Sequence, residues 1–149
     1  MARRIPSFEI DLGMLPIEPL LRRAVGADPQ DARQAWTILG LMARRDRPEA
    51  GIFLLGLLQV HQHDLAQMTA LIDAVALVPS AAAAEALKNE FLRVPSSRST
   101  RTYLNEVLRA ITHLSPPWVD QALSGLMDDK RLSPKWRRRA EEVAWRLNL

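Results

Sequence analysis

The residues whose types and spacing could support chemistry begin with the segment HQHD at positions 61–64. If this junction is irregular, His61, His63 and Asp64 could bring two imidazoles and a carboxylate to one metal ion. If both histidines are helical, a spacing of two residues points them to different sides of the helix. The paired-histidine spacing of metalloproteases is absent, so we expect Asp64 to cap a helix and expect neither a metal nor a cofactor.

The remaining candidates form no catalytic arrangement. Adjacent acids occur at positions 128–129 and 141–142, but such neighbours diverge on a helix, and in a turn they usually serve as caps or arginine partners. Three serines between positions 96 and 99 lack the strained turn of a serine nucleophile. The chain has no cysteine, which excludes disulfides and cysteine nucleophiles. We therefore expect a non-catalytic protein.

Three consecutive arginines lie in the helix-like segment SPKWRRRAEEVAWRL at positions 133–147. On a helical wheel Arg138 points to solvent, whereas Arg137 and Arg139 lie on opposite flanks and cannot form one flat basic surface with it. Glutamates four residues after Arg137 and Arg138, and four before Arg146, should form local pairs worth ~0.2–0.5 kcal/mol each. Half of the charge in this segment is therefore expected to have a local partner.

The elements that must position these residues are helices. Helix-start signals recur every 16 to 19 residues, at Asp28-Pro29, Arg47-Pro48, Asp64, Ser80, Ser99, Ser115-Pro116 and Ser133-Pro134. A capping oxygen accepts from a free N–H of the first turn, and a proline at the first helical position loses no hydrogen bond. No strand pattern follows the first dozen residues, so we expect an all-α chain of seven to eight helices.

Alternate helices repeat with a period of 36 residues. Each copy places its residues at i, i+3, i+4 and i+7, which is one apolar stripe of an α-helix. The copies are Ala32, Ala35, Trp36 and Leu39; Met68, Leu71, Ile72 and Val75; Leu104, Val107, Leu108 and Ile111; and Ala140, Val143, Ala144 and Leu147. Helix pairs that can bury their stripes only against neighbouring pairs indicate an α-solenoid.

The C-terminal unit, WVDQALSGLMDDKRLSPKWRRRAEEVAWRL, resembles a HEAT repeat. Asp129 falls at the turn between its two helices. Trp136 and Arg137 form the hydrophobic-Arg step, and Ala140 and Ala144 occupy the small positions. In such repeats this arginine usually reaches the turn aspartate, which implies that Arg137 pairs with one of the two turn aspartates.

The resemblance weakens toward the N-terminus. The preceding unit keeps Arg101 but has Thr100 in place of the hydrophobe, and the two earlier units keep only the apolar stripe. The resemblance implies a right-handed α-solenoid of about four HEAT-like antiparallel helix pairs over residues 16–149, after an irregular N-terminal arm over residues 1–15. An irregular helical bundle is the alternative.

Trp145 lies nearly opposite the apolar stripe of its helix, where an indole loses ~1.5–3 kcal/mol of burial unless another surface covers it. Packing on the preceding helix through an imperfect wheel is one explanation, and a protein contact is the other. Tryptophan and arginine are enriched among interface hot spots, so we expect a protein partner to contact Arg101, Arg138, Trp145 and Arg146. The expected function is that of an adaptor or scaffold.

Further basic residues could merge across stacked repeats into a ridge that binds phosphates or an acidic protein. They are Arg98, Lys130, Arg131, Lys135 and Arg139. Nucleic-acid binding is therefore the alternative function, although aromatic residues that could stack on bases are sparse. Some HEAT-like proteins are DNA glycosylases with a catalytic carboxylate among groove-lining aromatic residues. Trp118 near Asp120, at a helix start, is the only weak similarity to that arrangement in this sequence.

Composition is that of a globular domain, with 48% hydrophobic and 25% charged residues. Residues 1–92 carry a net charge of −2 and residues 93–149 a net charge of +5, so basic charge is concentrated toward the C-terminus. The longest uncharged run, about 14 residues, is too short to span a bilayer, and the N-terminus lacks a signal-peptide pattern. We expect a cytoplasmic protein without a membrane segment, and the sequence predicts no particular oligomeric state.

Overall fold

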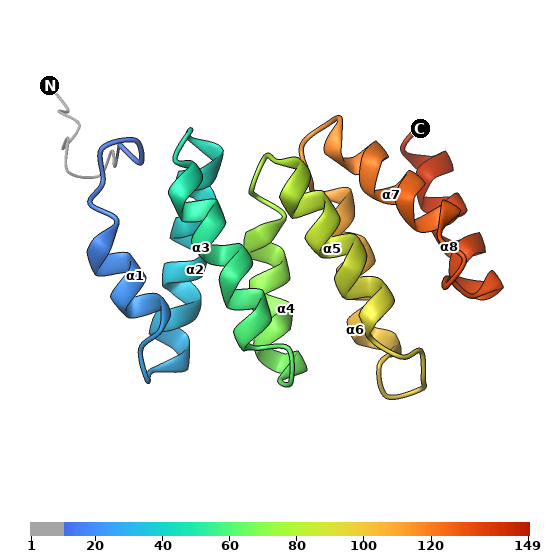
Figure 1. Cartoon of the computed structure of the whole chain (residues 1–149), viewed down its shortest axis with the longest axis horizontal. Helices are drawn as coiled ribbons and strands as arrows, with labels where there is room; N and C mark the ends of the chain where they lie inside the picture. Colours follow the sequence, from blue (N-terminus) through green and yellow to red (C-terminus); the bar gives the residue numbers. More distant parts are fainter. Residues whose placement is uncertain (1–10) are drawn as a thin grey trace, which may run out of the picture.

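The computed structural model describes residues 11–149, and in this part of the chain it contains eight α-helices and no strands (Figure 1). The helices are α1 (Glu18–Ala24), α2 (Pro29–Arg44), α3 (Pro48–Val60), α4 (Leu65–Val75), α5 (Ala81–Arg93), α6 (Arg101–Thr112), α7 (Trp118–Asp128) and α8 (Pro134–Arg146). The predicted all-α class is confirmed. None of these described helices is long and apolar enough to cross a membrane.

Side-chain caps set four of the described helix starts, those of α2, α4, α5 and α8. Five of the seven predicted starts are observed, those of α2, α3, α4, α5 and α8. Asp64, for example, accepts hydrogen bonds from the backbone N–H groups of Ala66 and Gln67. The starts of α6 and α7 were predicted one and two residues too early. Before α6, Thr100 Oγ1 donates to the Pro95 carbonyl at 2.7 Å, which closes a turn that the helix must follow.

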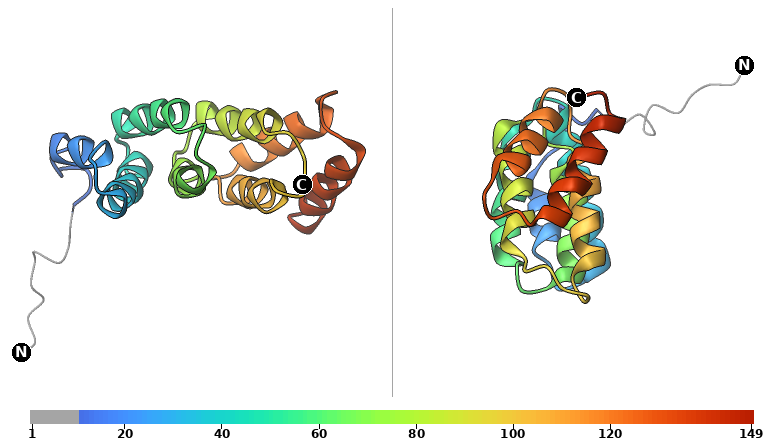
Figure 2. Two further views of the ribbon diagram at one scale, coloured as in Figure 1. Left: turned by 90° about the horizontal axis from the view of Figure 1, so that it is seen from below. Right: turned by 90° about the vertical axis from the view of Figure 1, so that its right-hand side faces the viewer.

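The helices form two rows along the long axis of the molecule. Helices α3, α5 and α7 lie in one row and α2, α4, α6 and α8 in the other, and Figure 2 shows both rows end-on. Close packing joins α2 to α4 and α4 to α6 within one row, and α5 to α7 within the other. Helices α2 to α7 therefore each pack against helices of both rows.

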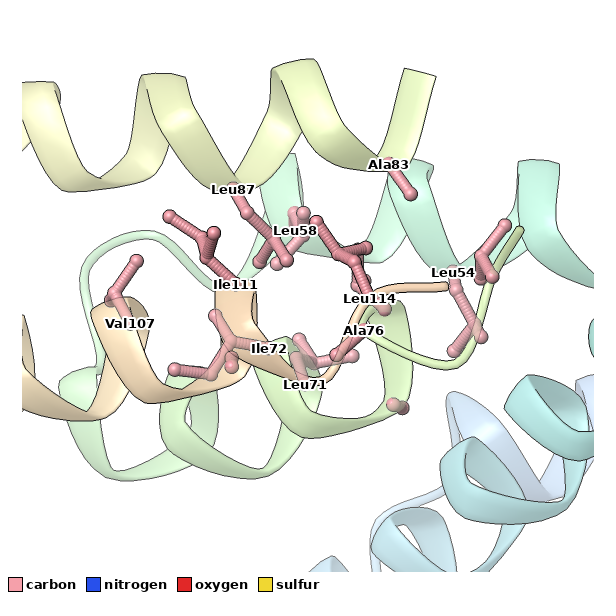
Figure 3. Packing of buried hydrophobic residues seen from close by; sticks show 14 of the residues in the cluster. Leu54, Leu58, Leu71, Ile72, Ala76, Ala83, Leu87, Val107, Ile111 and Leu114 are labelled. Atoms are coloured by element: carbon pink, nitrogen blue, oxygen red, sulfur yellow. The ribbon is translucent and has the colours of Figure 1, made fainter. Parts of the chain in front are cut away.

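The core lies between the two rows. All members of the first three copies of the 36-residue stripe are buried, including Trp36, Leu71 and Val107. Figure 3 shows side chains from α3, α4, α5 and α6 meeting there. The fourth copy departs from the prediction, because Val143 is only half-buried and Leu147 is 42% exposed.

Gly40 marks the closest approach of α2 to the end of α4. A Cβ at Gly40 would lie 2.7 Å from the Ala74 carbonyl oxygen, whereas a Cβ at exposed Gly56 would meet no atom within 4 Å. We predict that Gly40→Ala destabilises the protein by about 1–3 kcal/mol, because the two helices must move apart. Gly56→Ala should instead stabilise it by about 0.5–1 kcal/mol through helix propensity. Urea unfolding followed by circular dichroism measures both changes, and equal effects would argue against the close approach.

The predicted irregular arm over residues 1–15 is described only from residue 11, and residues 1–10 lie outside the described residues. Residues 11–15 form turns without helix. The Arg47 guanidinium, at the start of α3, donates hydrogen bonds of 3.0–3.2 Å to the carbonyl oxygens of Leu12, Gly13 and Leu15. The described part of the arm is thus attached to the helices.

Candidate partner-binding groove

A groove opens between α6 and α8, where the row of α2, α4 and α6 would be expected to continue its close packing. The backbones of α6 and α8 barely approach each other, unlike those of the preceding pairs in this row. A space of about 500 Å³ remains between them. Its lining, which we call the α6–α8 groove, consists of Asn105, Glu106, Leu108, Arg109, Thr112, Arg139, Val143, Arg146 and Leu147. Apolar side chains from both helices are therefore accessible beside charged ones.

Trp136 holds the first turn of α8 against α5. Its ring packs edge-on against Phe91, with ring centroids 5.3 Å apart and an interplanar angle of 84°. Its Nε1–H donates a 2.9 Å hydrogen bond to Ser96 Oγ in the loop between α5 and α6. The first turn of α8 therefore does more than continue the apolar stripe, because Trp136 precedes the stripe and anchors α8 from one end.

Beyond that anchor, the fourth stripe copy differs from the third in its surroundings. In the 36-residue register, Ala140 and Ala144 of α8 take the places that Leu104 and Leu108 occupy in α6. Both alanines are buried, and α8 packs against α7. Val143, at the register position of the fully buried Val107, lines the open groove instead of a closed core.

A smaller pocket of about 190 Å³ adjoins the groove and shares Asn105 and Arg139 with it. Its lining, which we call the cationic pocket, consists of Arg101, Asn105, Lys135, Trp136, Arg138, Arg139 and Glu142. Four cations thus surround this space with one carboxylate. Within residues 11–149, none of the four has a carboxylate partner within 4 Å.

The predicted contact residues are divided between two surfaces. Arg101 and Arg138 line the cationic pocket, and Arg146 lines the groove. Trp145 is 81% exposed, so it does not pack on the preceding helix. Because consecutive helical residues diverge by about 100°, Trp145 points away from the groove that Arg146 lines. It shares the outer face of α8 with Arg138, seven residues earlier.

The predicted local pairs of the arginine segment are not formed. Within the described chain, no ion pair joins Arg137, Arg138 or Arg146 to a glutamate of α8. Exposed pairs gain only ~0.2–1 kcal/mol and must order two long side chains, so other arrangements compete easily. The charge of Arg138 and Arg146 therefore remains available to a ligand.

Arg137 binds backbone oxygens instead of a turn carboxylate. Its guanidinium donates to the carbonyl oxygens of Met127, Asp129 and Leu132 at 3.0, 2.8 and 3.3 Å. The Asp129 carboxylate binds Arg131 at 2.9–3.0 Å, and these hydrogen bonds lower the pKa of Asp129 to about 2. The pairing that the HEAT resemblance implied is therefore wrong, because carbonyl groups at the end of α7 bind the arginine first.

The other residues of the predicted basic ridge differ in their surroundings. Arg131 is engaged by Asp129, whereas Arg98 and Lys130 are exposed in the turns at this end of the molecule. Arg109, in the wall of the groove, binds Glu106 at 2.6 Å and lies 3.9 Å from Asp73. The Glu106 hydrogen bond raises the pKa of Arg109, so its charge is already partnered.

The HQHD segment acts as a helix junction. Asp64 caps α4 as predicted, and the His61 ring lies 5.5 Å from the ring of Trp36. His63 is exposed. Among residues 11–149, no three histidine, cysteine, aspartate or glutamate side chains gather in a way that could hold a metal ion.

A buried polar network was not anticipated from the sequence. Glu90 is only 4% exposed and accepts hydrogen bonds from Arg93 at 2.7–2.8 Å and from the Tyr103 hydroxyl at 2.6 Å. Burial raises the pKa of Tyr103 above its usual range. The signal was present, because Glu90 lies on the same helical stripe as Leu87 and Phe91, where an apolar residue is expected.

Apart from the exposed Trp145, the tryptophans and the tyrosine within residues 11–149 offer no open surface for nucleobases. Tyr103, Trp36 and Trp136 are buried, and Trp118 is half-buried. The Asp120 carboxylate, two residues after Trp118, accepts a 3.2 Å hydrogen bond from Ser124 of the same helix.

Comparison of the chain with family models, curated proteins and solved structures finds no match in any of the three.

Proposed function

We propose that this protein is a non-catalytic scaffold that docks a helical segment of a partner protein in the α6–α8 groove. The observation that carries the proposal is the separation of α6 from α8, where the earlier helices of the same row pack closely. Helix-in-groove recognition needs accessible apolar side chains for anchors at i, i+3, i+4 and i+7. Val143 and Leu147 offer such contacts in a groove of about 500 Å³.

The charges around the groove favour an acidic partner. Arg139 and Arg146 line it without a carboxylate partner within the described chain, and the cationic pocket continues it. A helix with one apolar stripe and acidic residues along its edge would match both features. Arginine is also enriched among interface hot spots.

We further propose that the helices form a right-handed α-solenoid of HEAT-like pairs, α1–α2, α3–α4, α5–α6 and α7–α8. The two rows of helices and the 36-residue register of the buried stripes support this arrangement. In this arrangement the pairs α5–α6 and α7–α8 stack incompletely, and the partner segment binds in the groove that remains between α6 and α8.

Nucleic-acid binding, including a glycosylase-like role, ranks second. The same unpartnered cations favour it, but the accessible apolar side chains of Val143 and Leu147 in the adjoining groove give a phosphate backbone no favourable contact. Tyr103 is buried and cannot stack on bases. Nucleic acid that co-purifies with the protein and is released with a steep salt dependence would reverse the ranking.

Val143→Glu should abolish partner docking while Val60→Glu leaves it intact. Val143 lines the groove, whereas Val60 is 62% exposed at the end of α3. Forcing a carboxylate into a desolvated contact should weaken binding by about 30-fold or more. Affinity purification compares the proteins bound by the wild type and both variants, and hydrogen exchange then shows whether α6 and α8 become protected.

Two results would contradict this proposal. One is equal retention of the bound proteins by both variants, with circular dichroism showing that both are folded. The other is partner-induced protection of helices that do not form the groove.

A further inference from the structure

We infer that the cationic pocket binds a phosphoryl group, carried as a phosphorylated side chain by the partner segment that occupies the adjoining groove. The inference rests on the proposed function and specifies its partner. It is based on Arg101, Lys135, Arg138 and Arg139, which surround a space of about 190 Å³ with Glu142 as the one carboxylate.

The charge of this pocket is not compensated within the described chain. Eight arginines elsewhere have partners. Arg22, Arg23, Arg47, Arg93, Arg109 and Arg131 pair with carboxylates, and Arg44 and Arg137 donate to carbonyl oxygens. None of the four pocket cations has either kind of partner, although Lys135 lies 5.8 Å from the centre of the Trp136 ring. With Glu142 as the one carboxylate in the lining, the pocket keeps a net positive charge that an external anion would relieve.

A phosphoryl group matches the pocket better than a carboxylate does. It carries a charge of about −1.5 to −2 at neutral pH and three strong acceptor oxygens, whereas a carboxylate carries a single charge. Three arginine forks and one ammonium can share these oxygens in charge-assisted hydrogen bonds. The small volume suits one compact anion at the side of a bound segment.

The location ties the anion to the segment in the groove. The pocket and the groove share Asn105 and Arg139, so together they follow the lengths of α6 and α8. Arg138 and Val143 are five residues apart, which is about 7.5 Å along the helix axis. A helical partner could therefore place an apolar side chain on Val143 and a phosphorylated residue in the pocket, one to two turns apart.

A phosphorylated protein fits these observations better than a nucleic acid does. Four unpartnered cations share this one pocket. On the groove side, Glu106 neutralises Arg109, and the unpartnered Arg146 lies beside the apolar side chains of Val143 and Leu147. A single anionic group next to an apolar contact is the expected pattern of a modified side chain.

Inorganic phosphate tests the pocket directly. The chain has four tryptophans, and the indole N–H signal of Trp136, which lines the pocket, reports binding in NMR titrations. Phosphate should shift this signal saturably, whereas acetate at equal ionic strength should not. Arg138→Gln/Arg139→Gln should weaken phosphate binding by about tenfold or more, because two charged hydrogen-bond donors are lost. The matched control Arg33→Gln/Arg45→Gln removes the same charge from exposed positions on and just after α2 and should bind as the wild type.

The inference is overturned if phosphate and acetate shift the signal alike, or if the two double variants bind phosphate equally. It is also overturned if an oligonucleotide binds with a salt dependence steeper than four contacts explain. Phosphatase treatment of the proteins captured through the groove separates the two proposals. If the captured proteins no longer bind after phosphatase treatment, both the docking function and the phosphoryl group are supported. Unchanged binding that remains sensitive to Val143→Glu rejects only the phosphoryl group, and binding insensitive to both treatments rejects the docking function as well.

Discussion

Replacing Trp136 with alanine should release α8 from the rest of the molecule while the N-terminal helices stay folded. The side chain is 4% exposed, packs edge-on against Phe91 and donates its indole N–H to Ser96. Removing a buried tryptophan costs about 3–5 kcal/mol, because burial is lost and a cavity remains. Because α8 hardly contacts α6, its remaining hold is its packing on α7 and the hydrogen bonds of Arg137.

Residue-resolved hydrogen exchange measures this effect. Protection should fall in α8 first and most, because helices packed in rows depend mainly on their neighbours for stability. Trp145→Ala is the matched control, since its side chain is 81% exposed and its removal should change the free energy of unfolding by less than about 0.5 kcal/mol. Uniform loss of protection in α2 to α8 would show that Trp136 is no local anchor.

Arg93→Ala should be the second most damaging substitution, with a loss of about 3 kcal/mol in the free energy of unfolding. The change leaves the Glu90 carboxylate buried with the Tyr103 hydroxyl but without its cation. Breaking a buried pair from one side is costly, because the remaining charge is desolvated and uncompensated. Arg93 also donates to the Gln62 carbonyl at 3.2 Å, so the link between α5 and the junction before α4 is lost as well.

A double-mutant cycle isolates the charge effect. Glu90→Gln/Arg93→Ala should recover much of the loss, because the buried charge is gone together with its partner. Arg98→Ala, at an exposed position five residues later, should change stability by less than about 0.5 kcal/mol. Additive effects of Glu90→Gln and Arg93→Ala in urea unfolding would mean that the two side chains do not depend on each other.

Helix positions and the buried stripes could be predicted because they depend on local chemistry. Asp28 and Asp64 bind the first-turn N–H groups that their side chains can reach, so their sequence positions define the helix starts. The first three stripe copies are buried because a stripe of four apolar residues has no favourable alternative. These features need no knowledge of how the helices pack together.

The groove and the polar network could not be predicted in the same way, because they depend on distances between helices. The fourth copy keeps the apolar pattern of the other three, although α8 packs on α7 and stays apart from α6. Arg137 was assigned to a turn aspartate, but three carbonyl oxygens at the end of α7 lie closer. The sequence pattern indicates which residues are apolar and how they repeat along the chain. The groove, the polar network and the hydrogen bonds of Arg137 depend instead on the distances between helices.

The most direct test of the groove compares two positions that are one period apart. Val107 is fully buried between packed helices, and Val143, 36 residues later, lines the α6–α8 groove. Because the chain contains no cysteine, Val107→Cys and Val143→Cys each introduce a single thiol whose rate of labelling in the native protein can be measured. We predict that Cys at position 143 reacts about 100-fold faster or more, since the thiol at position 107 requires an opening of the core. Equally slow labelling of both variants would show that α8 closes on α6 and that no groove exists.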